Sequence, residues 1–305
     1  MRGYALRAAG RAATIAGLTT AVVVLMAGFA LVGVAVAGAG GAVAGIAVAV
    51  LLTVAGYACG DRLALSAMAA RPVSEVEQPE LYRLVRELST AGRLPVPRLY
   101  VSPAEQPNSF TVGRSPRTAA VCCTQGLLRL LDEAELRGVL GHELAHVSGY
   151  DILASSMSAG LATVVTFPAG LARFGRPGSP GTDGVRSAAG AAGSGGGGLE
   201  GLLMLLFGPV AAVLVRLSVS QEREYRADAT GALLTGDPVA LASALRKTDA
   251  GAAELPLAPD GRRISVGHLM IASPFRPEGV ARLFLTHPPA GERVRRLEAL
   301  AGYRR

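Results

Sequence analysis

Residues 12–60 read AATIAGLTTAVVVLMAGFALVGVAVAGAGGAVAGIAVAVLLTVAGYACG and contain no charged side chain. As one helix, at ~1.5 Å per residue, this stretch would extend ~73 Å, over twice the ~30 Å hydrocarbon core of a bilayer. The Gly-Ala-Gly-Gly sequence at 38–41 offers a turn. We therefore expect two transmembrane helices, over roughly 14–36 and 42–59. A cleaved signal peptide does not fit, because its apolar region spans only about 7–15 residues.

The composition of the 305 residues agrees with membrane helices. Half of the chain is hydrophobic, yet it has no Trp and only 5% aromatic residues, so Ala, Val and Leu supply most apolar side chains. This profile excludes a disordered or collagen-like chain, and three cysteines are too few for a disulfide framework. Cys59, Cys122 and Cys123 form no C-x-x-C pair, so a reducing compartment or plain packing explains them, and we assign them no function.

The positive charges predict an orientation in the membrane. The net charge is +7, with Arg2, Arg7 and Arg11 before the first span and Arg62 after the second. By the positive-inside rule, the N-terminus and the chain from Asp61 onward lie in the cytoplasm, at the plasma membrane. Ten arginines between 61 and 151 then belong to a domain beside the lipid bilayer. We expect no nucleic-acid partner, because no basic helix or aromatic-interleaved stripe is present.

Periodicity predicts the elements of this domain. Residues 80–91 are expected to form an amphipathic helix on four apolar positions: Leu81, Leu84, Val85 and Leu88. A second helix begins after Asp132, its N-cap, and runs to about Gly149. Three short strands are expected to form a small antiparallel sheet: 98–102, 109–113 and 118–123.

Two weaker apolar runs follow, at 152–172 and 201–215, joined by a Gly- and Ser-rich segment that we expect to be a flexible loop, 175–198. Each run is either a membrane span or a buried core helix, and we favour spans. The expected chain then has four parts: a tail with two spans (1–60), the first half of a cytoplasmic domain (61–151), two further spans with an outside loop (152–216), and the second half of the domain (217–305).

The sequence His142-Glu143-Leu144-Ala145-His146 lies in the second helix of this domain. His-Glu-x-x-His on a helix places two imidazoles on one face, one turn apart, where they bind Zn²⁺ beside the glutamate. We therefore expect one zinc per chain, with Glu143 as the general base of peptide hydrolysis. The metzincin class is excluded, because its third histidine would be residue 152, which is Ile.

A later helix supplies the third ligand that a catalytic zinc site needs. Glu222 and Arg226 have the spacing of an exposed ion pair, whereas Glu224 and Asp228 share another face. We expect Glu224 to bind the metal and Asp228 to accept a hydrogen bond from a ligand histidine. Because the ligands must meet, the chain between His146 and Glu224 crosses the bilayer an even number of times. Both weaker runs therefore span, or neither does.

Five motifs together resemble the HtpX-type membrane zinc metalloproteases, of the gluzincin class and related to the CAAX prenyl proteases. They are QPNSFTVGR at 106–114, TQGLL at 124–128, HELAHVSGYD at 142–151, REYRAD at 223–228 and THPP at 286–289. The resemblance covers about residues 75–295. Asn-Ser-Phe-Thr stands where the family has Asn-Ala-Phe-Ala, and Tyr150 stands where a basic residue is usual.

The resemblance implies a mainly α integral membrane protein, with four transmembrane helices and an α+β zincin-like cytoplasmic catalytic domain. It implies that the strand with Asn108, Ser109 and Phe110 binds substrate as an edge strand, where Asn108 is alternatively a turn residue. It suggests that His287 stabilises the oxyanion, although a helix-entry role fits equally. His268 is expected to be structural.

The implied substrates are unfolded or damaged membrane proteins, cut in quality control and stress response alongside other quality-control proteases. Two alternatives stay open. One is a sensor protease with a single dedicated substrate, although no ligand-binding domain is visible in the sequence. The other is a non-catalytic membrane scaffold with a vestigial zinc site, against which the intact Glu143 argues.

Overall fold

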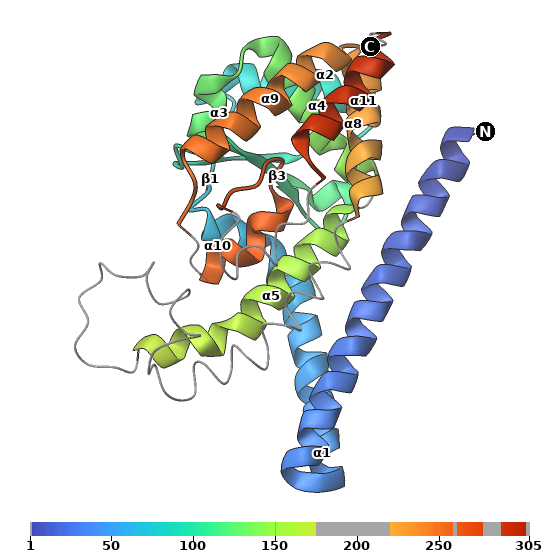
Figure 1. The fold of residues 1–305 in the computed structure, drawn as a ribbon, viewed down its shortest axis with the longest axis vertical. Coiled ribbons are helices and arrows are strands. Elements are labelled where there is room, and N and C mark those ends of the chain that lie inside the picture. The colour runs from blue at the N-terminus through green and yellow to red at the C-terminus, as the bar shows by residue number, and fades with distance from the viewer. Residues whose placement is uncertain (1, 150, 175–219, 259–260, 277–287, 303–305) are drawn as a thin grey trace.

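The computed structural model describes residues 2–149, 151–174, 220–258, 261–276 and 288–302. Figure 1 shows a long helical hairpin that projects from a mixed α/β domain. The strands are β1 (Arg71–Pro72), β2 (Arg98–Ser102), β3 (Ser109–Val112) and β4 (Ala120–Thr124). The helices are α1 (Arg2–Ala67), α2 (Pro79–Ala91), η1 (Pro116–Thr118), α3 (Gln125–Leu130), α4 (Glu133–Gly149), α5 (Asp151–Phe174), α8 (Gln221–Thr235), α9 (Pro238–Glu254), α10 (Gly261–Val266), η2 (Gly267–Leu269) and α11 (Ala290–Leu300).

The uncharged stretch forms the hairpin, because α1 breaks into two arms at Ala37 and Gly38. Gly38 has φ of 61°, which costs glycine little because it has no Cβ. The arms pack backbone to backbone: a Cβ on Gly45 would lie 2.2 Å from the carbonyl oxygen of Phe29. The turn falls at the start of the predicted 38–41 segment. The second arm continues beyond its predicted end and carries the chain into the domain.

The hairpin exposes its apolar side chains along most of its length. Within the described residues, Ala16–Ala67 is the stretch that length and composition make suitable for crossing a membrane. Val43 and Leu51 are 70% and 66% exposed, which is unlike a core helix of a water-soluble domain. The N-terminus returns to the level of the domain in Figure 1, so both ends of the hairpin lie on the domain's side.

The four-stranded sheet is mixed, and the prediction of an antiparallel sheet was wrong. The strand order is β1-β2-β4-β3, and β2 and β4 run parallel, while β3 and β4, and β1 and β2, are antiparallel. All five residues of β4 are buried, because this strand lies in the centre with covered faces. The three predicted strands are present within two residues of their expected bounds, and the two-residue β1 was not predicted.

Each face of the sheet contributes to a separate hydrophobic core. On β4, Val121 and Cys123 face α2, α4, α9 and α11, whereas Ala120 and Cys122 face the end of α1, α5 and η2. This alternation follows from the two-residue period of a strand. Burial raises the pKa of both thiols, which agrees with a packing role for this cysteine pair. Cys59 lies exposed on α1.

A local signal at its N-terminus places α4, the helix that carries the His-Glu-x-x-His motif. Asp132 caps α4, since its carboxylate accepts a hydrogen bond from the Glu135 amide at 2.9 Å, and the Glu135 carboxylate accepts one from the Asp132 amide. The run at 152–172 is helical within α5, which leaves the domain and packs along α1. The second run at 201–215 and the expected loop at 175–198 lie outside the described residues.

Candidate metal centre

His142 and His146 lie one turn apart on α4, and their Nε2 atoms are 3.2 Å from each other. Glu224, from the first turn of α8, brings its carboxylate oxygens within 3.8 Å of His142 Nε2 and 3.6 Å of His146 Nε2. Gly231 permits this close approach of α8, since a Cβ there would lie 2.7 Å from the backbone nitrogen of His142. One ligand atom from each of the three side chains therefore converges within 4.8 Å of the others.

A buried carboxylate and guanidinium orient the first histidine. Asp228 Oδ1 lies 2.9 Å from His142 Nδ1, which leaves Nε2 turned toward His146 and Glu224. Arg293 on α11 holds Asp228 through Nε at 2.8 Å and a second nitrogen at 2.7 Å, and donates to the Ile271 carbonyl. Burial would raise the pKa of Asp228, but the charge and hydrogen bonds of Arg293, with those of His142, lower it to about 2.

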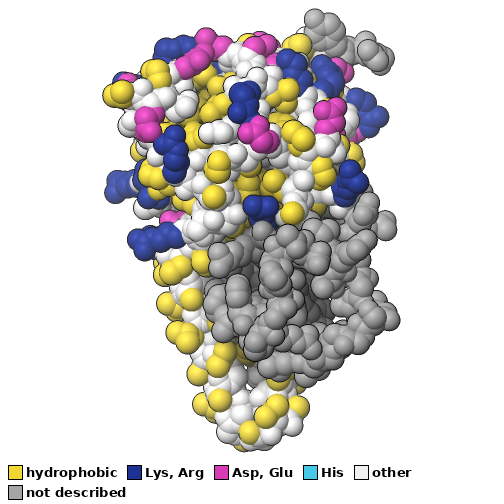
Figure 2. All heavy atoms as spheres, turned by 90° about the vertical axis from the view of Figure 1, so that its left-hand side faces the viewer, with side chains coloured by type: hydrophobic (Ala, Val, Ile, Leu, Met, Phe, Trp, Pro, Cys, Tyr) yellow, Lys and Arg dark blue, Asp and Glu magenta, His cyan; other side chains and the backbone are white. Residues whose placement is uncertain are grey.

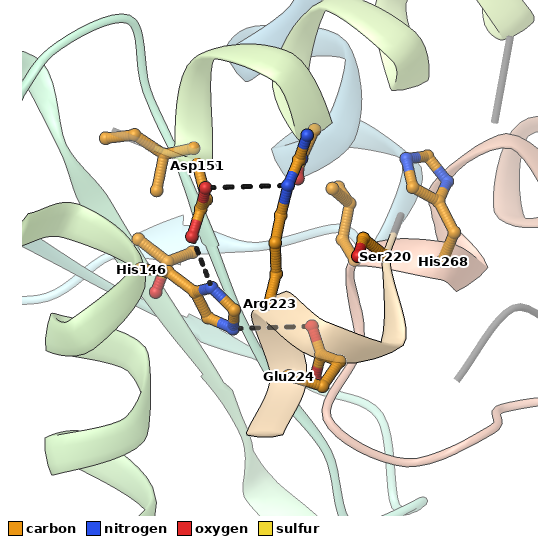
Figure 3. A pocket seen from close by; sticks show the side chains of 10 residues that line it. His146, Asp151, Ser220, Arg223, Glu224 and His268 are labelled. Atoms are coloured by element: carbon orange, nitrogen blue, oxygen red, sulfur yellow. Dashed lines mark ion pairs between the residues drawn. The ribbon is translucent and has the colours of Figure 1, made fainter. Parts of the chain in front are cut away.

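A second carboxylate serves the other histidine. Asp151, the first residue of α5, points toward His146 Nδ1 at 3.7 Å and toward Arg223 Nε at 3.7 Å (Figure 3). Burial would lower the pKa of His146, but the charges of Glu224 and Asp151 raise it to about 9. A cation that binds at this imidazole therefore has to displace a proton.

Glu143 projects from α4 toward β3, and both of its oxygens accept hydrogen bonds from that strand. Ser109 Oγ donates to Oε1 and Thr111 Oγ1 donates to Oε2, each at 2.6 Å. Ser109 and Thr111 are two residues apart on a strand, so their side chains share one face. The Glu143 carboxylate is 2% exposed and has a defined orientation beside the ligand set.

The structure gives the predicted substrate strand a different set of contacts. Asn108 is fully buried, and its side-chain amide pairs with the backbone of Ala272 and with Gln106. Ser109 contacts Glu143, its carbonyl accepts from the Ile271 amide, and Phe110 lies in the core. Thr124 N donates to Asn108 O, and the alternation of an antiparallel pair then turns the Thr111 backbone to the open edge of β3, where no strand among the described residues pairs with it.

A cavity opens beside His146, between the domain and the start of α5. Figure 3 shows His146, Asp151, Arg223 and Glu224 pointing into it, with Ser220 and His268 nearby. Thr111 of β3 also lines this cavity. His268 is buried in η2 and also lines this cavity. His287 lies outside the described residues, although Pro289 precedes α11 as expected.

Sequence reasoning missed three of these contributors. The spacing arguments assign none of Arg293, Ser109 and Thr111 to the metal centre, and they place Asp151 only within the motif at 142–151. A signal exists for Arg293, because it stands on the apolar face of α11 with Val294 and Leu297. A cation on such a face predicts a buried anionic partner. Glu222 is exposed and Glu224 is buried, as the face argument predicted.

Two histidines and a glutamate that converge from two helices, with a second glutamate held beside them, define the metal centre of a His-Glu-x-x-His metallopeptidase. Comparison with known proteins agrees, since the model of peptidase family M48 matches residues 75–301. The chain belongs to this family. It is a metalloendopeptidase, and the prediction of an HtpX-type protease is confirmed.

Several relatives cover most of the chain. A protease HtpX homolog of Kineococcus radiotolerans is 55% identical over 243 residues, 80% of each chain. The homolog of Paenarthrobacter aurescens is 47% identical over 258 residues, 82% of each chain. The homolog of Pelotomaculum thermopropionicum is 44% identical over 245 residues, 80% of this chain and 84% of the relative.

Proposed function

We propose that this membrane metalloprotease is a zinc endopeptidase that cleaves misfolded or damaged membrane proteins at the cytoplasmic face. The observation that carries the proposal is the Glu143 carboxylate, held by two hydroxyls next to three convergent ligands. A structural zinc site is normally closed by four protein ligands, whereas three ligands leave a position open for chemistry. This arrangement argues against the alternative of a vestigial scaffold.

The donor set fits zinc. Two imidazole nitrogens and one carboxylate are the ligands of a well-known class of catalytic zinc sites. Asp228 and Asp151 face the Nδ1 atoms of His142 and His146, which leaves the Nε2 atoms for the metal. His142, His146 and Glu224 would hold the ion. When bound, zinc supplies Lewis acidity, which polarises a peptide carbonyl and lowers the pKa of a water toward about 7.

Glu143 performs the proton transfers in this proposal. Its carboxylate accepts a proton from the attacking water and then passes the proton to the leaving amine. Ser109 and Thr111 keep both oxygens in place through the reaction, so little reorganisation is needed. The open edge of β3 at Thr111 pairs with an extended peptide through its backbone, which selects unfolded segments more than particular side chains. His287 is proposed to donate a hydrogen bond to the oxyanion.

The position of the cavity supports substrates from the membrane. Ile152 and Ser155, in the first turns of α5, line the cavity, and α5 packs along the apolar hairpin. An unfolded segment leaving the bilayer would therefore reach the site over a short path. The same geometry would serve a sensor protease with one dedicated substrate, and comparison of membrane proteomes with and without an active copy separates the two.

The proposed topology has four spans, with the N-terminus and the active site in the cytoplasm. The two ligand-bearing helices meet on one side, so the intervening chain makes an even number of crossings. Helix α5 packs against α1 as membrane helices do, since a Cβ on Gly60 would lie 2.2 Å from the Ser156 carbonyl and one on Gly160 would lie 2.8 Å from that of Gly56.

Glu143→Gln tests the catalytic role. The amide cannot accept the proton, so the variant should keep its zinc and its thermal unfolding temperature but lose cleavage of casein. Glu133→Gln, at an exposed position of the same helix, is the matched control and should cleave normally. Casein cleavage by Glu143→Gln at the wild-type rate would exclude Glu143 as the base.

Cysteine labelling tests the topology in a background without the three native cysteines. A cysteine at Ser194 should react with a membrane-impermeant maleimide in intact cells, because the 175–198 segment is proposed to lie outside. A cysteine at Ala250, which is exposed on α9, should react only after lysis. Protection of Ser194 until lysis would support a chain with two spans.

A further inference from the structure

The large exposed hydrophobic side chains of the second arm of α1 end at Tyr57. Val54 and Tyr57 are 56% and 47% exposed, and the first charged residues, Asp61 and Arg62, come one turn later. From Gly38 to Tyr57 the helix rises ~28 Å at ~1.5 Å per residue, which matches a ~30 Å hydrocarbon core. Tyr57 therefore lies at the level where aromatic rings meet lipid headgroups.

Four arginines gather at this level, where the hairpin enters the domain. Arg62 belongs to α1, Arg98 to β2, and Arg114 and Arg117 to the segment around η1. Arg62, Arg98 and Arg117 are exposed. Figure 2 shows the same transition in the described surface: hydrophobic side chains cover the lower hairpin, and Lys and Arg side chains begin above it.

Contacts connect the segment around η1 with β2 and with the second arm of α1, where Arg62 directly follows Asp61. Arg98 donates to the Thr118 carbonyl at 3.3 Å, next to Arg117, and its guanidinium is 3.9 Å from Asp61. The Arg114 amide donates to Thr118 Oγ1 at 3.2 Å, and the Arg114 guanidinium lies over the Tyr57 ring at 5.5 Å. Arg114 therefore lies over Tyr57, and Arg98 lies near Asp61, one turn further along α1.

The charge of the cluster is largely uncompensated. Among the residues that the structure describes, one carboxylate pairs with it, that of Asp61, so four positive charges face one negative charge. Arg114 Nε is buried without a hydrogen-bond partner in the same part of the chain. In contrast, Arg83, Arg86 and Arg246, on α2 and α9, each pair with a glutamate at 2.6 or 2.7 Å.

We propose that Arg62, Arg98, Arg114 and Arg117 form a binding surface for the headgroups of anionic phospholipids. Guanidinium groups match phosphate in charge and hydrogen-bond geometry, and a cluster beside a membrane helix attracts anionic lipid. Headgroup binding at this surface anchors the sheet next to the active site at one leaflet. It thereby sets the distance of β2 and η1 from the bilayer. It rests on membrane insertion of the hairpin, as proposed above.

The test uses the absence of tryptophan in the chain. Tyr57→Trp places a single fluorescent ring beside Arg114, and Val43→Trp places one near the turn, at the far end of the arm. The full-length variants are reconstituted in vesicles of phosphatidylcholine and phosphatidylglycerol, with either lipid brominated to quench tryptophan. Quenching of the tryptophan at position 57 should report a roughly fivefold preference for phosphatidylglycerol over phosphatidylcholine as the neighbouring lipid. This is the effect of about one Lys or Arg near an anionic surface. At position 43 no preference is expected.

Charge removal identifies the residues responsible. Replacing Arg62, Arg98 and Arg117 by Gln in the Tyr57→Trp protein should abolish the preference, because three exposed cations are lost. The matched control replaces Arg83, Arg86 and Arg246 by Gln, which removes the same charge from ion pairs elsewhere on the domain and should leave the preference unchanged. Equal quenching by both lipids at position 57, or a preference that survives the first triple replacement, would overturn the proposal.

Two further measurements distinguish a lipid surface from a site for soluble anions, and the surface from the membrane topology on which it rests. Replacing chloride by inorganic phosphate at equal ionic strength should leave the preference intact, whereas its loss would indicate a site for soluble anions and contradict a lipid surface. Resistance to alkaline carbonate extraction is expected of the inserted hairpin. Extraction would overturn both the membrane topology and this surface, whereas an inserted protein without lipid preference would overturn the surface alone.

Discussion

Arg293 donates hydrogen bonds from two nitrogens to Asp228, at 2.8 and 2.7 Å, and both side chains are almost fully buried. Because Asp228 in turn faces His142 Nδ1, residue 293 near the end of the chain controls an imidazole 151 positions earlier. The metal centre therefore depends on α11, which carries no metal ligand among the described residues.

Arg293→Lys should weaken zinc binding about 10-fold, at the low end of the usual 10–100-fold effect of losing such a supporting contact. Lysine keeps the charge that Asp228 needs but cannot bind both carboxylate oxygens in a plane. Competition with a chromophoric chelator measures the affinity. Arg246→Lys, at an exposed ion pair, is the control. Unchanged affinity in Arg293→Lys would mean that Asp228 orients His142 without help.

Glu224→Ala should abolish tight zinc retention, because two histidines alone leave the ion with too few protein ligands. Glu222→Ala, two residues earlier and exposed, should retain one zinc per chain. Metal analysis of both purified proteins after dialysis is the measurement. Full zinc in Glu224→Ala would remove this residue from the site.

The pair Ser109→Ala and Thr111→Val should lower kcat by about 10–100-fold with little change in KM, since the loss of both hydroxyls frees the Glu143 carboxylate from its working position. The zinc content should stay the same. The conservative pair Ser109→Thr and Thr111→Ser keeps both hydroxyls and should restore most activity. Equal kcat for the hydroxyl-free and wild-type proteins would contradict a positioning role.

Gly160→Leu should destabilise the contact between α5 and α1, because the space beside Gly160 is already filled by the backbone of Gly56. Overpacking of this kind costs about 1–3 kcal/mol. Gly28→Leu, on the first arm of the hairpin, is the control, since a Cβ there meets nothing within 4 Å. Thermal unfolding in detergent compares the two. An equal effect of both substitutions would argue against close packing of α5 on α1.

Glu135→Gln should lower the stability at neutral pH by about 1.5–3 kcal/mol, the size of hydrogen bonds to a charged group. Burial raises the pKa of Glu135, but hydrogen bonds from Lys247, Ser243 and the Asp132 amide outweigh it, so the pKa lies below its usual 4.5. For an acid with a lowered pKa, the stabilisation is present above the pKa of the unfolded chain. It disappears as the pH falls through the folded pKa.

Unfolding of wild type and Glu135→Gln at pH 7 and pH 3 checks this sign. The difference between them should shrink at pH 3, where the wild-type carboxylate gains a proton. Glu133→Gln, whose side chain is 54% exposed, should show a smaller difference at both pH values. A gap that widens toward pH 3 would contradict the assignment.

The sequence by itself determined the features that depend on short spacing. Two histidines at i and i+4 share a helix face whatever the rest of the chain does, and an uncharged stretch longer than a bilayer folds back at its glycines. The cap of α4 by Asp132 was also predictable, because an N-cap depends on residues within one turn of the helix start. The face that separates Glu224 and Asp228 from Glu222 was also readable from the helical period alone.

Only the tertiary structure decided which distant groups meet. The strand order is one case: β4 lies between β2 and β3, where both of its edges are paired and helices cover both of its faces, and no local period carries this information. The partners of buried charges are the other. Glu143 meets the hydroxyls of β3, and Asp228 meets Arg293, because a buried ionic group requires a partner and packing chooses which one reaches it.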